Sequence, residues 1–240
     1  MQQISGYLRR AVDNFEMIAP GERVAVALSG GKDSMLLLHA MKHLSRYHPA
    51  KFDIFAIFID LGFKNIDIGA LKQVCSDLEV PLVIRETDIA PLVFDIRQES
   101  NPCALCAKMR RGAIHDAALE QGCRTIALGH HRDDAVETLA MNLIYEGRIG
   151  CFQPVTYLDR KDVRTIRPMI YLTERQIENT VRKFNIPIVK NPCPMDHTSM
   201  RTETKNLLKE AEERFPGLAD RLFGAIQRSD LPGWKKGESL

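Results

Sequence analysis

The sequence predicts an α/β protein built around a parallel, doubly wound sheet. Short apolar segments typical of buried strands alternate with segments whose apolar residues recur at helical spacing. Polar residues and glycines follow several of the strand segments, where such sheets bind ligands. The chain has 240 residues, enough for one α/β domain or two small ones.

The elements follow in a regular order. Residues 4–16 suit a short amphipathic helix that precedes the first strand. Strands are then expected at 23–28, 53–59, 81–85, 125–128 and 163–166. Helices are expected between and after them at 34–45, 66–79, 106–121, 133–145 and 174–184. After Pro187 the pattern changes, and a loop at 191–194 leads to helices at 203–214 and 217–228.

We expect one domain over residues 1–240, with an N-terminal helix within 1–19 and a C-terminal loop and helices within 191–230. The tail from 231 to 240 looks frayed. No apolar run approaches the roughly 18 residues that span a bilayer, so we expect no membrane partner. The N-terminus lacks a basic region followed by an apolar core, which favours a cytoplasmic protein. A net charge of +2 does not by itself indicate a nucleic-acid partner.

The first strand leads directly into Ser29-Gly30-Gly31-Lys32-Asp33-Ser34. Two glycines allow a tight turn whose backbone N–H groups point inward, and the following helix presents its positive end to an anion. Lys32 adds a point charge for a phosphate oxygen, and Ser34 can cap the helix. Asp33 would repel phosphate unless Mg²⁺ lies between them, so this loop predicts a metal-bridged nucleotide.

Other phosphate loops do not fit this stretch. A Walker A loop needs Gly-x-x-x-x-Gly-Lys-Ser/Thr, and a dinucleotide fingerprint needs Gly-x-Gly-x-x-Gly. The remaining alternative is an ordinary strand-to-helix turn that carries glycines. The well-formed apolar face of the helix that follows favours the anion-binding loop. Asp60 and the run Gly129-His130-His131 also fall at predicted strand ends.

The six cysteines fall into two groups. Cys75, Cys123 and Cys151 lie within or beside apolar segments, as small buried hydrophobes do. Cys103, in Asn-Pro-Cys-Ala-Leu-Cys, and Cys193, in Asn-Pro-Cys-Pro, follow prolines in predicted loops that would hold their thiolates outward. Cys106 ends the first of these motifs and opens the predicted helix at 106–121.

Three kinds of site remain open for Cys103, Cys106 and Cys193. The Cys-x-x-Cys pair alone could be a redox centre. The three cysteines with His197 could bind zinc. The three cysteines without a fourth ligand could hold an iron–sulfur cluster that leaves one iron open.

The motifs occur in a specific order: the loop at 29–34, the Cys-x-x-Cys before a basic helix, Gly-His-His-x-Asp-Asp at 129–134, and a late Pro-Cys-Pro. This combination resembles the tRNA 2-thiocytidine synthetase family of PP-loop ATP pyrophosphatases, and its thiouridine-forming relatives. The resemblance covers about residues 20 to 229. The chain lacks the terminal zinc fingers of some thiouridine relatives, which favours cytidine.

The resemblance implies a five-stranded parallel sheet of the nucleotide alpha-hydrolase type. It implies that Cys103, Cys106 and Cys193 bind a [4Fe–4S] cluster, whose open iron receives sulfur from a donor such as a cysteine desulfurase or free sulfide. ATP would adenylate the C2 oxygen of a tRNA cytidine and release pyrophosphate, and sulfur would then replace that oxygen. A homodimer is implied by resemblance only.

The resemblance also implies roles for single residues. The ATP site would comprise Ala27, Leu28, Ser29, Gly30, Gly31, Lys32, Asp33, Ser34, Asp60, Gly129 and His130. Asp33 would hold Mg²⁺ together with Asp133 or Asp134. Catalytic roles fall to Lys32 at the pyrophosphate, to the three cysteines, and to Asp133 as general acid or base. Asp133 could instead cap its helix, and the role of His131 is open.

The chain has no separate RNA-binding module, so a tRNA groove would be built from basic residues of the domain. The candidates are Lys108, Arg110, Arg111, Arg164, Arg167, Arg201 and Lys205, although charge alone favours solvated helix faces for such residues. Some relatives carry a catalytic lysine at the position of Arg110. Three other functions compete with cytidine thiolation: uridine thiolation, a PP-loop ligase with structural zinc, and a nucleotide-binding redox sensor without turnover.

Overall fold

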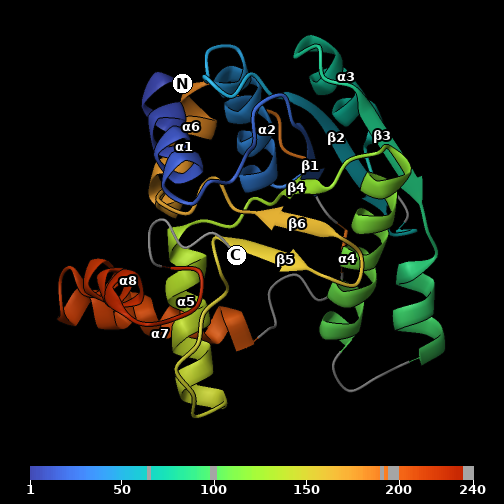
Figure 1. Cartoon of the computed structure of the whole chain (residues 1–240). Helices are drawn as coiled ribbons and strands as arrows, with labels where there is room; N and C mark the ends of the chain where they lie inside the picture. Colours follow the sequence, from blue (N-terminus) through green and yellow to red (C-terminus); the bar gives the residue numbers. More distant parts are fainter. Residues whose placement is uncertain (64–65, 98–101, 190–191, 194–199, 235–240) are drawn as a thin grey trace.

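The computed structural model describes residues 1–63, 66–97, 102–189, 192–193 and 200–234. Its centre is a six-stranded sheet in the order β3-β2-β1-β4-β6-β5, with helices on both faces (Figure 1). Five strands run parallel: β1 (Arg23–Leu28), β2 (Asp53–Asp60), β3 (Leu82–Glu86), β4 (Thr125–Ala127) and β6 (Val163–Ile166). The predicted doubly wound α/β fold is confirmed.

The sixth strand, β5 (Val155–Leu158), pairs antiparallel with β6 at the edge of the sheet. The sequence analysis did not predict it. Val155 and Thr156 are half-buried, and Tyr157 and Leu158 are exposed. This edge strand therefore lacks the alternation of apolar and polar residues from which strands are predicted. A turn at 159–162, where Asp162 has a φ of +50°, connects the two strands as a hairpin.

The helices agree with the predicted order but differ at several ends. They are α1 (Gln2–Asn14), α2 (Lys32–Ser45), α3 (Ile68–Asp77), α4 (Pro102–Glu120), α5 (Arg132–Tyr145), α6 (Glu174–Lys183), α7 (Met200–Arg214) and α8 (Leu218–Arg228). A π-helix, η1 (Pro91–Arg97), was not predicted. No helix in the described part of the chain is long and apolar enough to cross a membrane.

The start of α4 corrects one prediction. Cys103 lies in the first turn of this helix and not in a loop before it, whereas Cys106, predicted to open the helix, lies in its second turn. Proline is well tolerated at the first helical position, because the N–H that it lacks would have no helical partner there. Pro102 therefore begins the helix, and the spacing of three residues places both cysteines on one helix face.

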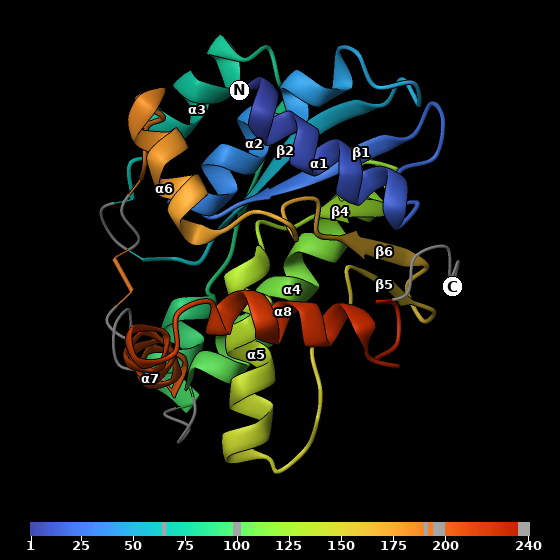
Figure 2. The ribbon, with the colours of Figure 1, turned by 90° about the vertical axis from the view of Figure 1, so that its left-hand side faces the viewer.

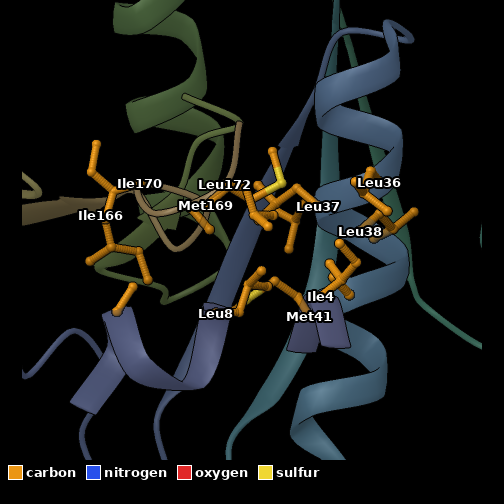
Figure 3. Close-up of a cluster of buried hydrophobic side chains, with 14 of the residues drawn as sticks. Ile4, Leu8, Leu36, Leu37, Leu38, Met41, Ile166, Met169, Ile170 and Leu172 are labelled. Carbon is orange, nitrogen blue, oxygen red and sulfur yellow. The ribbon is translucent and has the colours of Figure 1, made fainter. Parts of the chain in front are cut away.

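Two apolar layers cover the two faces of the sheet. Along β1, Val24, Val26 and Leu28 face one layer, and Ala25 and Ala27 face the other. The first layer is the larger and contains residues from α1, α2, α3, α5, α6 and α8. The second contains residues from α4 and η1. Figure 3 shows part of the first layer, in which Ile4 and Leu8 of α1 lie beside Met41 of α2.

The C-terminal helices α7 and α8 pack against α5, and Figure 2 shows α8 crossing it. The chain then returns to the core at Trp234, which is 2% exposed. Its indole N–H donates to the Phe152 carbonyl at 3.0 Å, and its ring lies edge-on to Phe223. The predicted fraying is therefore wrong up to residue 234, because a buried aromatic side chain holds this segment.

Candidate active site at the carboxyl edge of the sheet

The loop after β1 lies where the strand order reverses, because β1 has β2 on one side and β4 on the other. Such a reversal leaves a crevice at the carboxyl ends of the strands. Asp60 ends β2, and Gly129 lies two residues beyond β4, so both reach the same edge as the loop. The parallel register therefore gathers the predicted nucleotide-binding segments in one place.

Hydroxyl groups hold the loop at 29–34 in shape. Ser34 Oγ accepts from the Ser29 N–H at 3.0 Å and donates to the Gly31 carbonyl at 3.1 Å. The Gly31 N–H donates to Ser29 Oγ at 3.3 Å. Helix α2 begins at Lys32 with Gly31 at the N-cap, so the prediction that Ser34 caps this helix is wrong. Its hydroxyl closes the loop instead.

Two glycines let other backbone segments approach the loop. Gly30 has a φ of +84°, and a Cβ there would lie 2.9 Å from Val189 Cβ. The Val189 N–H donates to the Gly30 carbonyl at 2.9 Å. On the other side, a Cβ on Gly129 would lie 3.2 Å from the backbone nitrogen of Ser34. The loop is thus fixed between two segments far from it in sequence.

Lys32 is held by a carboxylate that the sequence analysis missed. Its Nζ lies 3.0 Å from Glu174 Oε1, and Lys205 Nζ lies 2.6 Å from the same carboxylate. Burial alone would raise the pKa of Glu174, but hydrogen bonds from Lys205 and Lys32 hold that pKa at about 2. In sequence, Glu174 is an ordinary acid in the first turn of a helix, so no local signal could have identified it.

Asp33 contributes an unpartnered oxygen to the site. Its Oδ1 is buried, and no described group hydrogen-bonds to it. Burial raises the pKa of Asp33, although the charges of Lys32 and His131 oppose this shift. A buried carboxylate oxygen without a partner is costly, and a divalent cation bound with the nucleotide would satisfy it. Asp33 therefore fits the predicted Mg²⁺ ligand.

The two other predicted Mg²⁺ ligands already have partners. Asp133 Oδ2 accepts from the Glu174 N–H at 2.6 Å. Asp134 accepts from the His131 N–H at 2.9 Å and from Arg201 at 3.0 Å. His131, not Asp133, is the N-cap of α5. Within the described ranges, no three His, Cys, Asp or Glu side chains gather closely enough to hold one metal ion.

The histidines and Asp60 differ in their surroundings. Burial and the nearby Arg167 lower the pKa of His130 to about 4, so its ring is neutral at pH 7. This ring lies 5.2 Å from that of Phe152, and its buried Nδ1 has no hydrogen-bond partner among the described residues.

His131 is buried, and its Nε2 lies 3.8 Å from Asp33 Oδ1. Asp60 Oδ1 accepts from the Gly62 N–H at 2.9 Å and stabilises a turn.

The thiols of Cys103 and Cys193 both act electrostatically on that of Cys106. Burial raises the pKa of Cys106; the nearby Cys193 and Cys103 add to this rise, and Arg110 opposes it. Such effects fall with distance, so Cys193 lies near Cys106 in space although it is far along the chain. The Val189–Gly30 contact explains this, since it holds the chain beside the loop four residues before Cys193. His197, the fourth ligand of the zinc alternative, lies outside the described residues.

The other cysteines lie apart from this group. Cys75 and Cys123 are buried, as predicted, and Cys151 is half-buried. Burial raises the pKa of Cys75 to about 11 and that of Cys151 to about 12. These thiols remain protonated at pH 7 and are poor metal ligands.

The basic residues proposed for RNA do not form one surface. Lys108 and Arg111 are exposed on α4, and Arg201 and Lys205 of α7 lie at the carboxyl edge, paired with acids. Arg167 is 9% exposed and donates to the Gln153 carbonyl at 2.6 Å. Arg164 lies at the amino edge, where it donates to Glu22 at 2.7 Å. The structure does not bring Arg164 to the site.

A small pocket opens beside the loop. It is lined by Ser29, by Phe58, Ile59 and Leu61 at the end of β2, and by Ile66, Arg110 and Val189. Its walls are apolar except for the Ser29 hydroxyl and the Arg110 guanidinium. At about 10 Å³ it has room for about one water-sized group.

The family model of the PP-loop domain matches residues 4–211 of this chain. The tRNA-cytidine(32) 2-sulfurtransferase of Syntrophotalea carbinolica is 34% identical over 220 residues, which cover 90% of this chain and 85% of the relative. The enzyme of the same name from Hahella chejuensis is 35% identical, with 91% and 77% covered. The fold resembles the U34-tRNA thiolase NcsA from Methanococcus maripaludis, solved with its [4Fe-4S] cluster, with a TM-score of 0.77 and 23% identity over 93% of this chain and 76% of NcsA.

Proposed function

The chain belongs to the tRNA-cytidine 2-sulfurtransferase family of PP-loop proteins, and we propose that it replaces the C2 oxygen of a tRNA cytidine with sulfur, using ATP. Its relatives act on cytidine 32, and we propose the same nucleotide here. One observation supports this proposal: the candidate phosphate loop and the segment that leads to Cys193 lie at one edge of the sheet, and Cys103 and Cys193 act electrostatically on Cys106. The loop would help an oxygen to leave, and the thiols would hold the cluster that receives sulfur.

The loop supplies the leaving-group chemistry. Oxygen on a pyrimidine C2 leaves poorly, and its transfer to the α-phosphate of ATP makes it part of AMP, which leaves readily. The N–H groups of the loop, the Ser29 and Ser34 hydroxyls and Lys32 would stabilise the charge that develops on pyrophosphate. The N-terminal end of α2 adds its dipole. Glu174 holds Lys32 in place before the nucleotide arrives.

We place Mg²⁺ on Asp33, whose buried Oδ1 lacks a hydrogen-bond partner in the described structure. Asp134 adds negative charge at Asp33, but it would have to give up Arg201 to join the metal. Asp133 remains our general acid or base. It lies in the first turn of α5 and binds the Glu174 N–H, next to the carboxylate that holds Lys32.

A donor set of three thiols fits a [4Fe–4S] cluster. When bound, the cluster would hold the donor's sulfur for the exchange with oxygen. Cys103 and Cys106 would hold it from one face of α4, and Cys193 from the segment that follows Val189. Zinc on the same thiols is the competing proposal. A cysteine desulfurase or free sulfide would provide the sulfur, and a homodimer in the cytoplasm is our expectation for the assembly.

Analysis of tRNA nucleosides tests the function. We expect a strain without this gene to lack 2-thiocytidine, and the wild-type gene, but not a Cys193→Ser variant, to restore it. Unchanged 2-thiocytidine would reject the proposal, and loss of 2-thiouridine instead would move the substrate to uridine. Metal analysis after anaerobic purification tests the cofactor: we expect about four irons per chain. One stoichiometric zinc and no iron would reject the cluster.

A further inference from the structure

Arg110 is a half-buried cation without a counter-ion in the described structure. It lies in the third turn of α4, and its guanidinium reaches back along the helix toward Cys106, four residues earlier. Its one described hydrogen bond is weak, from Nη2 to the Leu28 carbonyl at 3.5 Å. Burial lowers the pKa of Arg110, and no carboxylate acts on it. A guanidinium has five N–H donors, so most of its binding capacity is unused.

Two other arginines, by contrast, have partners within the protein. Arg201 is paired with two carboxylates, Asp134 at 3.0 Å and Glu137 at 3.3 Å. Arg167 donates to the Gln153 carbonyl at 2.6 Å and lies over the ring of Phe152. A half-buried charge with neither kind of partner costs the fold free energy. We therefore look for the partner of Arg110 in a ligand.

The position of Arg110 indicates which ligand. Its guanidinium lines the small pocket together with Ser29 of the loop. At about 10 Å³ this pocket has room for about one water-sized group and not for a base or a ribose. An anion bound at Ser29 of the loop therefore lies next to Arg110. In ATP, the α-phosphate is the phosphate adjacent to the pyrophosphate that the loop would hold.

We propose that Arg110 binds the α-phosphate of ATP and keeps hold of it as AMP after pyrophosphate has left. This inference rests on the proposed function. The C2 oxygen attacks the α-phosphorus, the bond to the β-phosphate oxygen breaks, and pyrophosphate leaves into the loop. Sulfur then bonds to C2, the C2–O bond breaks, and the electron pair leaves with AMP. The charge on the α-phosphate persists through both steps, and a guanidinium that never loses its proton matches it.

Calorimetry on the purified holoenzyme tests whether Arg110 binds the α-phosphate while the loop binds pyrophosphate. AMP and pyrophosphate serve as separate probes. We expect Arg110→Gln to weaken AMP binding about 10- to 100-fold, as for loss of a charge-assisted hydrogen bond, and to change pyrophosphate binding less than about 2-fold. Lys32→Ala should do the reverse. Arg110→Lys should fall between, because it keeps the charge without the planar fork. Arg111→Gln removes the same charge from the exposed neighbour and should leave AMP binding unchanged.

Pyrophosphate binding reports whether each variant is folded. If wild-type protein binds AMP and Arg110→Gln binds it equally well, the inference is wrong while the proposed function stands. Equal weakening of AMP and pyrophosphate would also overturn it, because Arg110 would then support the whole loop. A variant that keeps AMP affinity but loses iron would show that Arg110 serves the cysteines instead. A wild-type protein that binds neither ATP nor AMP would reject the proposed function itself.

Discussion

The two edges of the sheet differ in whether their polar groups have partners within the protein. At the amino edge, Glu22 accepts from Arg164 at 2.7 Å and also from the Thr125 hydroxyl. These side chains line a hollow in which Glu22 and Asp162 are paired with Arg164 and Arg124. At the carboxyl edge, Asp33 Oδ1 and His130 Nδ1 are buried without a described hydrogen-bond partner.

This difference identifies the site better than cavity size does. A buried polar atom without a partner costs free energy, so a fold retains it where a ligand supplies the partner. The hollow at the amino edge is larger than the pocket beside the loop, yet its charges neutralise one another. We therefore expect substitutions at the carboxyl edge to affect turnover, and those at the amino edge to affect stability.

The largest expected effect is at Lys32. Lys32→Ala removes the cation that faces the leaving pyrophosphate, and we expect kcat/KM for tRNA thiolation to fall about 100- to 1000-fold. Single-turnover assays measure this loss, with Lys209→Ala of α7, which is exposed, as the control. Urea unfolding of Lys32→Ala should stay within about 1 kcal/mol of wild type. If stability and activity fell together, the expectation that the carboxyl edge serves turnover and the amino edge stability would be wrong.

Gly30→Ala should affect both stability and turnover. The new Cβ would meet Val189 Cβ at 2.9 Å, at a φ of +84° that side chains disfavour. We expect a cost of about 1–3 kcal/mol in the free energy of unfolding, together with a loss of activity. Gly6→Ala is the matched control, since nothing lies within 4 Å of a Cβ on Gly6 within α1. It should stabilise the protein by up to about 1 kcal/mol.

Glu22→Gln tests the amino edge. It leaves the half-buried Arg164 without its anionic partner, and we expect a loss of about 1–3 kcal/mol in the free energy of unfolding. A double-mutant cycle with Arg164→Met isolates the pairwise energy. The turnover number should not change. A fall in turnover at full occupancy with stable protein would mean that the hollow has a part in the reaction.

Glu174 predicts a pH dependence of stability. Its folded pKa of about 2 lies below the ordinary value of 4.5, so the ionised group stabilises the fold above about pH 4.5. That contribution is lost as pH falls from 4.5 toward 2. We expect it to be about 1–2 kcal/mol after solvent screening, and absent in Glu174→Gln. Unfolding curves at pH 7 and at about pH 2, below which the contribution is gone, measure it, with the exposed Glu178→Gln of α6 as the control.

The smallest effects are expected at the exposed cations. Arg111→Gln should weaken tRNA binding a few-fold and lower the slope of log affinity against log salt by about 1. Arg164→Gln should leave both quantities unchanged, because this side chain lies at the amino edge beside Glu22. Filter binding over a range of salt concentrations distinguishes the two. Equal effects of the two substitutions would mean that tRNA also reaches the amino edge.

Much of the carboxyl edge could be predicted from local sequence. The loop at 29–34 carries its own signal, because glycines, a lysine and a helix start are neighbours in the chain. The order of strands and helices followed from apolar periodicity, and the end of a parallel strand is the same edge for every strand. The missed strand β5 and the early start of α4 lie where periodicity is weak or proline begins a helix.

Charge partners could not be predicted in the same way. Arg110, Arg164 and Arg167 are alike in sequence, yet one faces the pocket, one pairs with Glu22 and one is buried over an aromatic ring. Glu174 reaches Lys32 only because α6 packs against α2. Contacts between such distant segments depend on how the layers pack, and composition does not encode them.

The sequence by itself thus determined the chemistry that the chain can carry: a phosphate loop, acids beside it and three thiols outside the apolar segments. These features are local, because turn geometry and residue type act between neighbours in the chain. Only the tertiary structure decided which groups are partnered and which are left for a ligand. That outcome depends on burial and on distances of a few ångströms between segments that meet only when the sheet and its helices pack.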